Sequence, residues 1–328
     1  MAVELYHALK QINRIRRKEI VLPIARREVV VSPLSVGDDL ILKTALISPV
    51  KLDKELMYLL WQHTEFWFPS ENVQPVQQSE AKDGVQMPPQ NRGRKKKFKS
   101  QEEEDKSGGR YKSIPEQEFY NTISYFDKLV LIWGIYNVTY GTLGTQTITC
   151  QNCQKEFDIE VVVDDTLHED SMTLWEEDKP PFNKYTESIE IPLNEEYMLE
   201  FSVCIPSMAD FNRLLSLVPT SEIQNNLETI RSEFNTEQLM TLYTKRLSVY
   251  AKDKPEEKIT SGATREILSS IKDCLNIDVA TEFFKQYAER FSKYNVSFYM
   301  LSKCPDCGEE VKTPIDFEYQ FFRKQLPN

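Results

Sequence analysis

Four of the six cysteines form two pairs with the same spacing, and these are the residues best suited to chemistry. Two residues separate Cys150 from Cys153, and two separate Cys304 from Cys307. This spacing allows two thiolates on one tight turn to bind a single metal ion. Two such turns supply the tetrahedral shell of four sulfurs that structural zinc prefers. Because four protein ligands leave no position for water, we predict one structural zinc ion without a catalytic role.

Other uses of these cysteines are redox chemistry and disulfide formation. A thioredoxin-like motif would lie at the start of a helix after a βαβ strand, whereas both pairs here lie between strand-like runs. The remaining two, Cys204 and Cys274, stand alone in apolar surroundings and are predicted to be buried thiols. The pattern favours a reducing compartment over a secreted disulfide framework.

Each cysteine pair is predicted to form the tip of a β-hairpin, which we call the first knuckle (residues 150–153) and the second knuckle (residues 304–307). Strands over residues 145–149 and 157–163 flank the first knuckle, and a strand over 296–301 leads into the second. Gly308 directly follows the second knuckle and provides the positive φ that such turns often need. A shared zinc ion would pin the end of the chain to its middle.

Length and composition limit the class of protein. The chain has 328 residues, of which 40% are hydrophobic, so it can form one or two cores. A net charge of −11 argues against nucleic-acid binding by the molecule as a whole. The first 20 residues lack the apolar core of a signal peptide, and no apolar run reaches the length of a membrane span. We therefore expect a soluble protein that is intracellular at synthesis.

The first 68 residues are predicted to form an amphipathic N-terminal segment, a hairpin and two helices. Residues 1–18 are basic and amphipathic, either a solvated helix end or a docking element for an acidic partner. A hairpin is expected over residues 19–32. Ser35 is a plausible helix N-cap, and Pro49 would end that helix. The second helix, over residues 53–66, carries His63 on its apolar face, where packing is a better explanation than catalysis.

Residues 69–115 differ sharply in composition from their surroundings. Apolar residues nearly vanish, and a basic block at 92–99 precedes an acidic block at 102–105. Such a segment cannot bury enough surface to offset the entropy lost on ordering, so we predict a disordered insertion. The basic block could contact nucleic acid or act as a nuclear signal, but a solvated loop with self-neutralising halves is the simpler interpretation.

The rest of the chain is predicted to be helical with one further hairpin. The hairpin covers residues 188–193 and 198–205, and an acidic loop over 164–184 precedes it. Within this loop, His168, Glu169 and Asp170 are adjacent in the sequence. Three adjacent side chains rarely converge on one site, so we do not expect a metal or acid–base site here. Helical patterns and caps indicate helices over residues 116–136, 208–217, 221–232, 236–250, 264–274 and 279–294. A linker is expected over residues 251–260.

Together these patterns predict an α+β fold in which small β-hairpins and a packed helical core are closed by a zinc-ribbon-like site, with a mostly helical C-terminal region. Residues 1–68 and 116–205 would form an N-terminal α+β domain, and 206–295 a helical domain. Residues 296–328 would carry the second knuckle and an aromatic tail, which is either a peg into the core or an anchor for a neighbour.

The common catalytic motifs are missing from the sequence. There is no phosphate-binding loop, no G-x-G-x-x-G, no G-x-S-x-G elbow and no H-E-x-x-H. The chain has only three histidines, few for acid–base chemistry. Carboxylates are abundant, but in an acidic protein they single out no pair. We predict a protein that is not an enzyme; the enzymatic alternative is a hydrolase that uses a pair of carboxylate side chains.

The order of the motifs is the basis of a family resemblance. A Pro-Leu-Ser-Val-Gly-Asp-Asp motif opens a helix, an apolar helix leads into the first knuckle, and an acidic strand follows; these lie at residues 33–39, 125–136 and 157–165. Three further features complete the order: a hairpin at 189–193, a helix after 205–207, and the second knuckle with its aromatic tail. In this order, which covers residues 20–66 and 116–215 and the tail, the chain resembles the baseplate hub and hub-assembly proteins of T-even-type tailed phages. The charged insertion departs from the resemblance.

The resemblance implies a structural or chaperone-like assembly protein of a contractile-tailed phage. Its partners would be other baseplate hub or tail proteins, including a tape-measure or tail-lysozyme protein. It would act in the host cytoplasm during assembly and could remain in the virion at the tail baseplate. The alternative hypothesis is a zinc-ribbon factor that binds nucleic acid in transcription or replication, motivated by the basic block at 92–99.

Overall fold

The computed structural model describes residues 16–45, 49–69, 110–217 and 235–317. Within these residues the fold is α+β, with helices packed against several small antiparallel sheets, as the sequence predicts. Three predicted segments lie wholly or mostly outside the described residues: the amphipathic N-terminal segment over 1–18 except its last three residues, most of the charged insertion, and the helix at 221–232. No helix in the described ranges is both long enough and apolar enough to cross a membrane.

The first sheet has the order β1-β2-β3-β4. The predicted hairpin is confirmed as β1 (Lys18–Leu22) and β2 (Arg27–Val31). The next strand, β3 (Thr64–Phe68), occupies the end of what the sequence indicated as a helix. The last strand, β4 (Arg110–Lys112), lies inside the predicted disordered insertion, and its pairing with β3 orders these three residues.

Five helices share the larger core with the first sheet. They are α2 (Val36–Ala45), α3 (Pro49–Gln62), α4 (Glu116–Thr122), α5 (Asp127–Tyr140) and α6 (Met208–Leu217). Pro49 begins α3, where a proline is tolerated because the first helical N–H has no partner in the helix.

The predicted single helix over residues 116–136 is wrong, because the chain breaks between α4 and α5. Ile123 is extended, with φ −91° and ψ 133°. Ser124 and Asp127 then satisfy each other's backbone N–H groups, which begins a new helix instead of continuing the old one.

Helix α5 is the centre of this core and is buried almost all round. It packs so closely on the first sheet that a Cβ at Gly134 would lie 3.0 Å from Ile20 and 3.1 Å from Val31. The helix ends at Gly141, whose φ of 73° is in the left-handed region that glycine adopts easily. Glycine at both positions follows from this geometry.

A second core forms around the sheet β10-β9-β8-β7. Its strands are β7 (Glu187–Pro192), β8 (Tyr197–Val203), β9 (Thr244–Ala251) and β10 (Ile259–Ser261). Helices α7 (Thr236–Tyr243), α8 (Thr264–Cys274) and α9 (Ile277–Phe291) accompany it. The hairpin predicted at 188–205 and the helix at 264–274 are confirmed.

The predicted helix over residues 236–250 is wrong in its second half. Helix α7 ends at Tyr243, and the next eight residues form β9, which pairs with β8 through register partners such as Phe201 and Leu247. The predicted linker at 251–260 is mainly the turn between β9 and β10. The described residues after 205 therefore mix helices with strands instead of being mostly helical, and the second sheet includes strands on both sides of the boundary predicted at 205–206.

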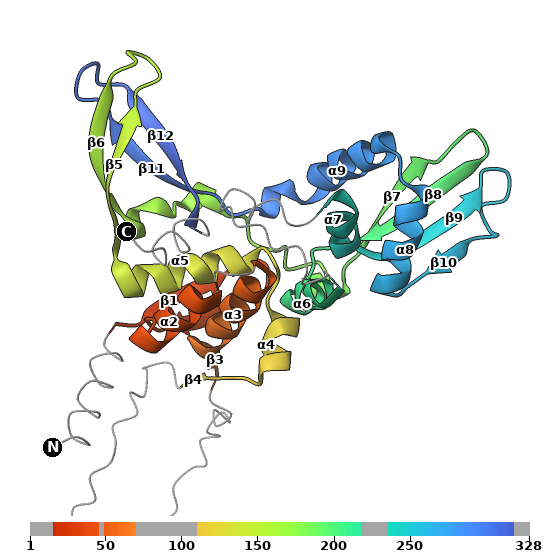
Figure 1. The fold of residues 1–328 in the computed structure, drawn as a ribbon, viewed down its shortest axis with the longest axis horizontal. Coiled ribbons are helices and arrows are strands. Elements are labelled where there is room, and N and C mark those ends of the chain that lie inside the picture. The colour runs from red at the N-terminus through yellow and green to blue at the C-terminus, as the bar shows by residue number, and fades with distance from the viewer. Residues whose placement is uncertain (1–15, 46–48, 70–109, 218–234, 318–328) are drawn as a thin grey trace, which may run out of the picture.

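Two further hairpins project from the first core as an arm (Figure 1). One consists of β5 (Thr142–Thr149) and β6 (Glu156–Val162), the other of β11 (Phe298–Lys303) and β12 (Glu310–Ile315). At the base, the Phe298 ring stacks on Trp133 at 6.3 Å, and buried Phe317 packs against Tyr136. Phe317 is thus a peg into the protein's own core, whereas residues 318–328 lie outside the described ranges.

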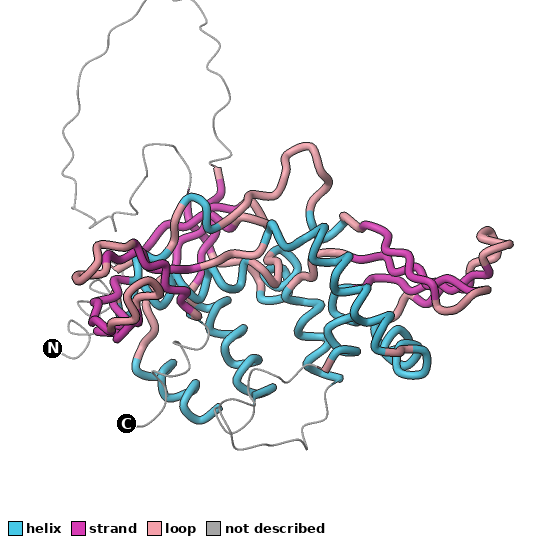
Figure 2. Tube along the Cα trace, turned by 90° about the horizontal axis from the view of Figure 1, so that it is seen from above, coloured by secondary structure: helices cyan, strands magenta, loops and turns pink. Residues whose placement is uncertain are grey.

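The arm and the second sheet lie at opposite ends of the molecule, with helices between them (Figure 2). Residues 163–186 connect β6 to β7 and contain the short helical turns η1 (Val163–Thr166), η2 (Glu169–Ser171) and η3 (Phe182–Lys184). We call this segment, the acidic loop of the sequence, the strap.

Candidate metal centre

The two knuckles meet at the tip of the arm. One sulfur from each of Cys150, Cys153, Cys304 and Cys307 lies within 4.8 Å of the other three. Two of the contacts cross between the hairpins: 3.6 Å separates the sulfurs of Cys150 and Cys307, and 3.6 Å those of Cys153 and Cys304. The structure therefore brings together all four predicted ligands, in a cluster compatible with one structural metal ion such as zinc.

The knuckles share one backbone design. In the first, the Cys150 N–H donates to Lys155 O at 2.9 Å, and the Gln154 N–H donates to Cys150 O at 2.9 Å. In the second, the Cys304 N–H donates to Glu309 O at 2.8 Å, and the Gly308 N–H donates to Cys304 O at 2.9 Å. The same offsets recur, so the two turns present their cysteines in the same way.

Both turns need a residue with positive φ directly after their second cysteine. This residue is Gly308 in the second knuckle, with φ 75°, as the sequence predicts, and Gln154 in the first, with φ 61°. Gln154 offsets part of the steric cost with a side-chain hydrogen bond of 2.8 Å from Nε2 to Gln151 O. Sequence reasoning missed this position because glutamine does not signal a left-handed conformation.

Backbone N–H groups stabilise the ionised form of one thiol in the cluster, which favours binding of a cation. The N–H groups of Cys307 and Asp306 direct hydrogen bonds at the Cys304 sulfur and lower the pKa of this thiol to about 7. The Lys155 N–H acts in the same direction on Cys153, but burial and the neighbouring thiols outweigh it and raise the pKa of Cys153 to about 12. Sulfurs this close cannot all ionise together unless a cation compensates their charge, and a bound metal ion supplies that charge.

The surroundings of the cluster hold the two hairpins together. Ile148 and Val311 are buried beneath the sulfurs and form a small apolar cluster with Phe157. An exposed ion pair, 2.6 Å between Lys155 Nζ and Asp306 Oδ1, joins the two tips. This pair is solvated and contributes little to stability, so the cysteines are the main connection between the tips.

The hairpin geometry also bears on the redox alternative. Neither pair lies at the start of a helix; both lie on tips between antiparallel strands. The helix dipole that lowers the pKa of a thioredoxin-like cysteine is therefore missing from both knuckles. Outside the knuckles, Cys204 is buried, as the sequence predicts. Burial raises the pKa of its thiol to about 12, so this thiol is inert at neutral pH. The side chain of Cys274 is outside the described set.

The adjacent residues His168, Glu169 and Asp170 do not converge on one site. The His168 ring stacks on Tyr299 at 4.2 Å, and its Nε2 lies 3.0 Å from Tyr299 O. Asp170 accepts a hydrogen bond from the Tyr299 hydroxyl. These contacts fix the strap to β11, which is a structural role.

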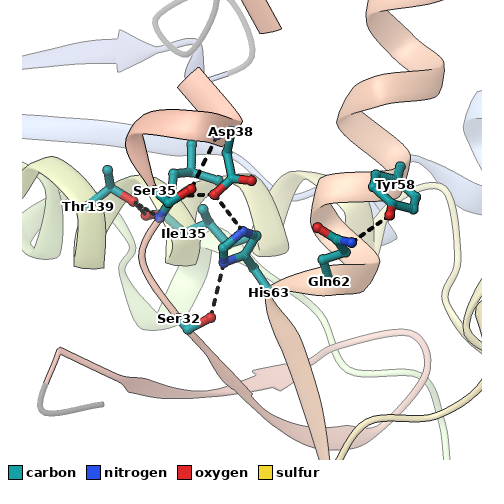
Figure 3. A network of polar contacts seen from close by, with 9 residues as sticks. Ser32, Ser35, Asp38, Tyr58, Gln62, His63, Ile135 and Thr139 are labelled. Carbon is teal, nitrogen blue, oxygen red and sulfur yellow. Dashed lines mark hydrogen bonds and ion pairs between the residues drawn. The ribbon is translucent and has the colours of Figure 1, made fainter. Parts of the chain in front are cut away.

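A serine, a histidine and an aspartate meet at a place that the sequence did not indicate (Figure 3). Ser32 Oγ lies 3.1 Å from His63 Nδ1, and His63 Nε2 lies 3.2 Å from Asp38 Oδ2. The set has the serine–histidine–aspartate order of a hydrolase triad, but with the two ring nitrogens exchanged, because in such a triad the serine meets Nε2 and the aspartate Nδ1. It therefore needs a test against the other parts of such a site. The residues come from the end of β2, the start of α2 and the residue before β3.

The backbone around Ser32 argues against catalysis by this triad. An acyl-transfer site needs free N–H groups to stabilise the oxyanion. The Ser32 N–H donates to His63 O, residue 33 is proline, and the Leu34 N–H donates to Thr139 Oγ1. The neighbouring amides are thus all occupied, and we interpret the triad as a polar connection between three elements. The sequence-based view of His63 as packed agrees with this geometry.

Comparison with known proteins identifies no relative of this chain. No family model matches the chain, and neither a curated protein nor a solved structure matches it. The architecture and the four-cysteine cluster are therefore the basis for any functional conclusion.

Proposed function

We propose that this chain is a non-enzymatic structural or assembly protein in which one zinc ion, bound by Cys150, Cys153, Cys304 and Cys307, clasps two hairpins into a rigid arm. The observation that carries the proposal is the meeting of four sulfurs from hairpins distant in the sequence. Sulfur ligands favour zinc over magnesium or calcium, and four of them close the shell. The clasp joins the middle of the chain to its C-terminal part.

The motif order in the sequence supports a more specific role, in the baseplate hub of a contractile-tailed phage or in its assembly. The arm is the element that we assign to partner contact, because it projects from the core while its base is fixed by Phe298 and Phe317. Its partners would be other hub or tail proteins. A tagged chain from infected cells should retain baseplate proteins, and the Cys304→Ser variant should not. If the wild-type chain and the Cys304→Ser variant retained the same tail proteins, the partner contact would not depend on the zinc clasp.

The nucleic-acid alternative has less support from the described residues. Around the knuckles, the four exposed acidic side chains Glu156, Asp306, Glu309 and Glu310 outnumber the two exposed cations, Lys155 and Lys303. A surface of this sign repels phosphate. The basic block at 92–99 lies outside the described residues, so the structure gives this alternative no observation of its own.

The zinc clasp predicts a stoichiometric metal and a large effect of removing one ligand. Purified protein should contain one zinc per chain, and Cys304→Ser should lose the metal and much of its thermal stability, because structural zinc contributes about 10 kcal/mol or more of apparent binding energy. Metal analysis and thermal unfolding measure the two effects.

Cys204→Ala is the matched control, because it removes a buried cysteine outside the cluster and should keep the zinc. Protein without stoichiometric zinc, or a Cys304→Ser variant with unchanged stability, would contradict the proposal.

A further inference from the structure

Three aromatic rings surround the ammonium group of Lys179 in the strap. Its Nζ lies 5.2 Å from the ring centroid of Trp175, 5.0 Å from that of Tyr185 and 5.8 Å from that of Tyr294. A cation within about 6 Å of a ring centroid is attracted by the negative face of the ring. The rings also contact each other, with centroids 5.2 Å apart for Trp175–Tyr185 and 5.0 Å for Trp175–Tyr294. They form the walls of a cage.

A carboxylate gives this cage a fixed negative charge. Glu176 Oε2 lies 3.3 Å from Lys179 Nζ, and Glu176 also accepts a hydrogen bond from the Tyr294 hydroxyl. Burial opposes ionisation of Glu176, but hydrogen bonds from Lys293 and Tyr294 outweigh it and lower its pKa to about 2. The carboxylate is therefore charged at neutral pH, and it shares this charge between two cations: Oε1 pairs with Lys293 at 2.6 Å, and Oε2 faces the ammonium group of Lys179.

Contacts that do not involve Lys179 hold the cage in place. Trp175 and Tyr294 are only 3% and 1% exposed. The Trp175 backbone N–H donates to Pro23 O at 2.9 Å, and its indole N–H donates to Pro180 O at 2.9 Å. The Lys179 side chain keeps 26% of its surface exposed, so the cage opens to solvent on one side. The walls are thus preorganised independently of their occupant.

We propose that Trp175, Tyr185, Tyr294 and Glu176 form a binding site for an alkylammonium ion, and that the protein fills this site with its own Lys179. Aromatic faces combined with a carboxylate recognise organic ammonium groups. The occupant fastens the strap to Tyr294 in η5 (Ser292–Tyr294), directly after α9. Because Trp175 also binds Pro23 in the β1–β2 turn, the occupied cage connects the second core to the first sheet.

Emptying the site provides the test. In full-length Lys179→Ala, the missing part of the side chain corresponds to propylammonium, which should raise the melting temperature saturably by about 2–4 °C over sodium chloride at equal ionic strength. The wild type, whose cage is filled, should not respond. Propanol has the same stem without the charge and should give no comparable rise.

The Lys179→Ala/Tyr185→Ala variant is the matched control, because it also removes the partly exposed wall of the cage. It should lose the response to propylammonium. An equal response to propanol, or no response of Lys179→Ala to propylammonium, would overturn the proposal.

Two further substitutions keep the proposal testable if Lys179→Ala does not fold. Lys179→Met keeps an apolar stem of similar length without the charge and should lower the melting temperature by roughly 2–6 °C, whereas Lys179→Arg keeps a cation and should lie closer to wild type. A Lys179→Met variant as stable as wild type would show that the cage does not bind the ammonium group.

Discussion

At the scale of single residues, the two knuckles allow the cost of a positive φ to be compared between a glutamine and a glycine in the same molecule. Gln154 and Gly308 occupy equivalent positions with φ 61° and φ 75°. A residue with a Cβ pays about 1 kcal/mol or more for this conformation, and glycine does not. A Cβ at Gly308 would meet no atom within 4 Å, so the cost of a substitution there is conformational and not a clash.

Exchanges at these positions should therefore act in opposite directions. We expect Gly308→Ala to lower the free energy of unfolding of the zinc-loaded protein by about 1 kcal/mol. Gln154→Gly should be neutral or stabilising, because relief of the strained φ competes with loss of the bond to Gln151 O. Denaturant unfolding measures both changes. A neutral Gly308→Ala would show that backbone conformation at this turn is not limiting.

At the scale of elements, helices α2 and α6 of the described chain begin with the same Ser-x-x-Asp capping box, and the same exchange lies just before α5. In α2, Ser35 N–H donates to Asp38 Oδ2 at 2.6 Å, and Asp38 N–H donates to Ser35 Oγ at 3.3 Å. Ser124 with Asp127 and Ser207 with Asp210 repeat the exchange before α5 and α6. Each box satisfies two N–H groups that a helix start leaves open.

Each of these aspartates also binds a second element. Asp38 contacts His63, and Asp127 accepts from the N–H groups of Ile24 and Ala25 in the β1–β2 turn, at 2.9 and 3.0 Å. Asp210 accepts from Lys245 in β9 at 2.6 Å. The boxes therefore set helix starts and also connect them to strands, so one carboxylate determines both local and tertiary structure.

The box of α2 has a pH signature. Burial opposes ionisation of Asp38, but hydrogen bonds from His63 and Ser35 outweigh it and lower its pKa to about 2. A carboxyl with a lowered pKa in the folded state stabilises the protein above its unfolded value of 3.8, and this contribution disappears as the pH falls to about 2. The contribution of Asp38 corresponds to about 2 kcal/mol.

Asp38→Asn should reveal this contribution. Near pH 7 the variant should be less stable than wild type by about 1–2 kcal/mol, and the difference should narrow as the pH falls from about 4 to about 2. Denaturant unfolding at a series of pH values gives the difference, and loss of metal at low pH affects both proteins alike. A constant difference across this range would mean that Asp38 acts through shape and not through its charge.

At the scale of the whole molecule, the described chain consists of two cores, a projecting arm and a strap. The arm is fixed at its base by aromatic contacts and at its tip by the cysteine cluster. The second core is built from β7 to β10 with α8 and α9 and contains none of the four cysteines. Removal of a metal should therefore loosen the arm and spare the second core.

Hydrogen exchange after chelation tests this separation. A zinc chelator should increase exchange in β5, β6, β11 and β12 toward the knuckles, while β8 and β9 keep their protection, because local opening follows the contacts that are lost. Uniform deprotection would show instead that the clasp supports the entire fold. Unchanged exchange in the arm would show that the apolar contacts alone hold the hairpins together.

The sequence by itself determined the features whose signals are local. The cysteine spacing indicated the four members of the cluster, and the flanking runs placed both pairs on hairpins. Gly308, Ser35 and the helices at 208–217 and 264–274 were also readable from nearby residues. The boxes at Ser124 and Ser207 were readable in the same way, because the Ser-x-x-Asp spacing is present in the sequence, but they were missed.

Only the tertiary structure decided features that depend on distant partners. Residues 244–251 could continue a helix, but hydrogen bonds to β8 make them a strand, and β4 is ordered by β3 in the same way. The Ser32–His63–Asp38 triad and the Lys179 cage each need one partner that is distant in the chain: His63 lies 31 residues from Ser32, and Tyr294 lies 115 residues from Lys179. The spacing of a cysteine pair indicates its chemistry directly from the sequence. Strand pairing and the cage form only once the chain has folded, because their stability comes from contacts between segments that no local sequence pattern specifies.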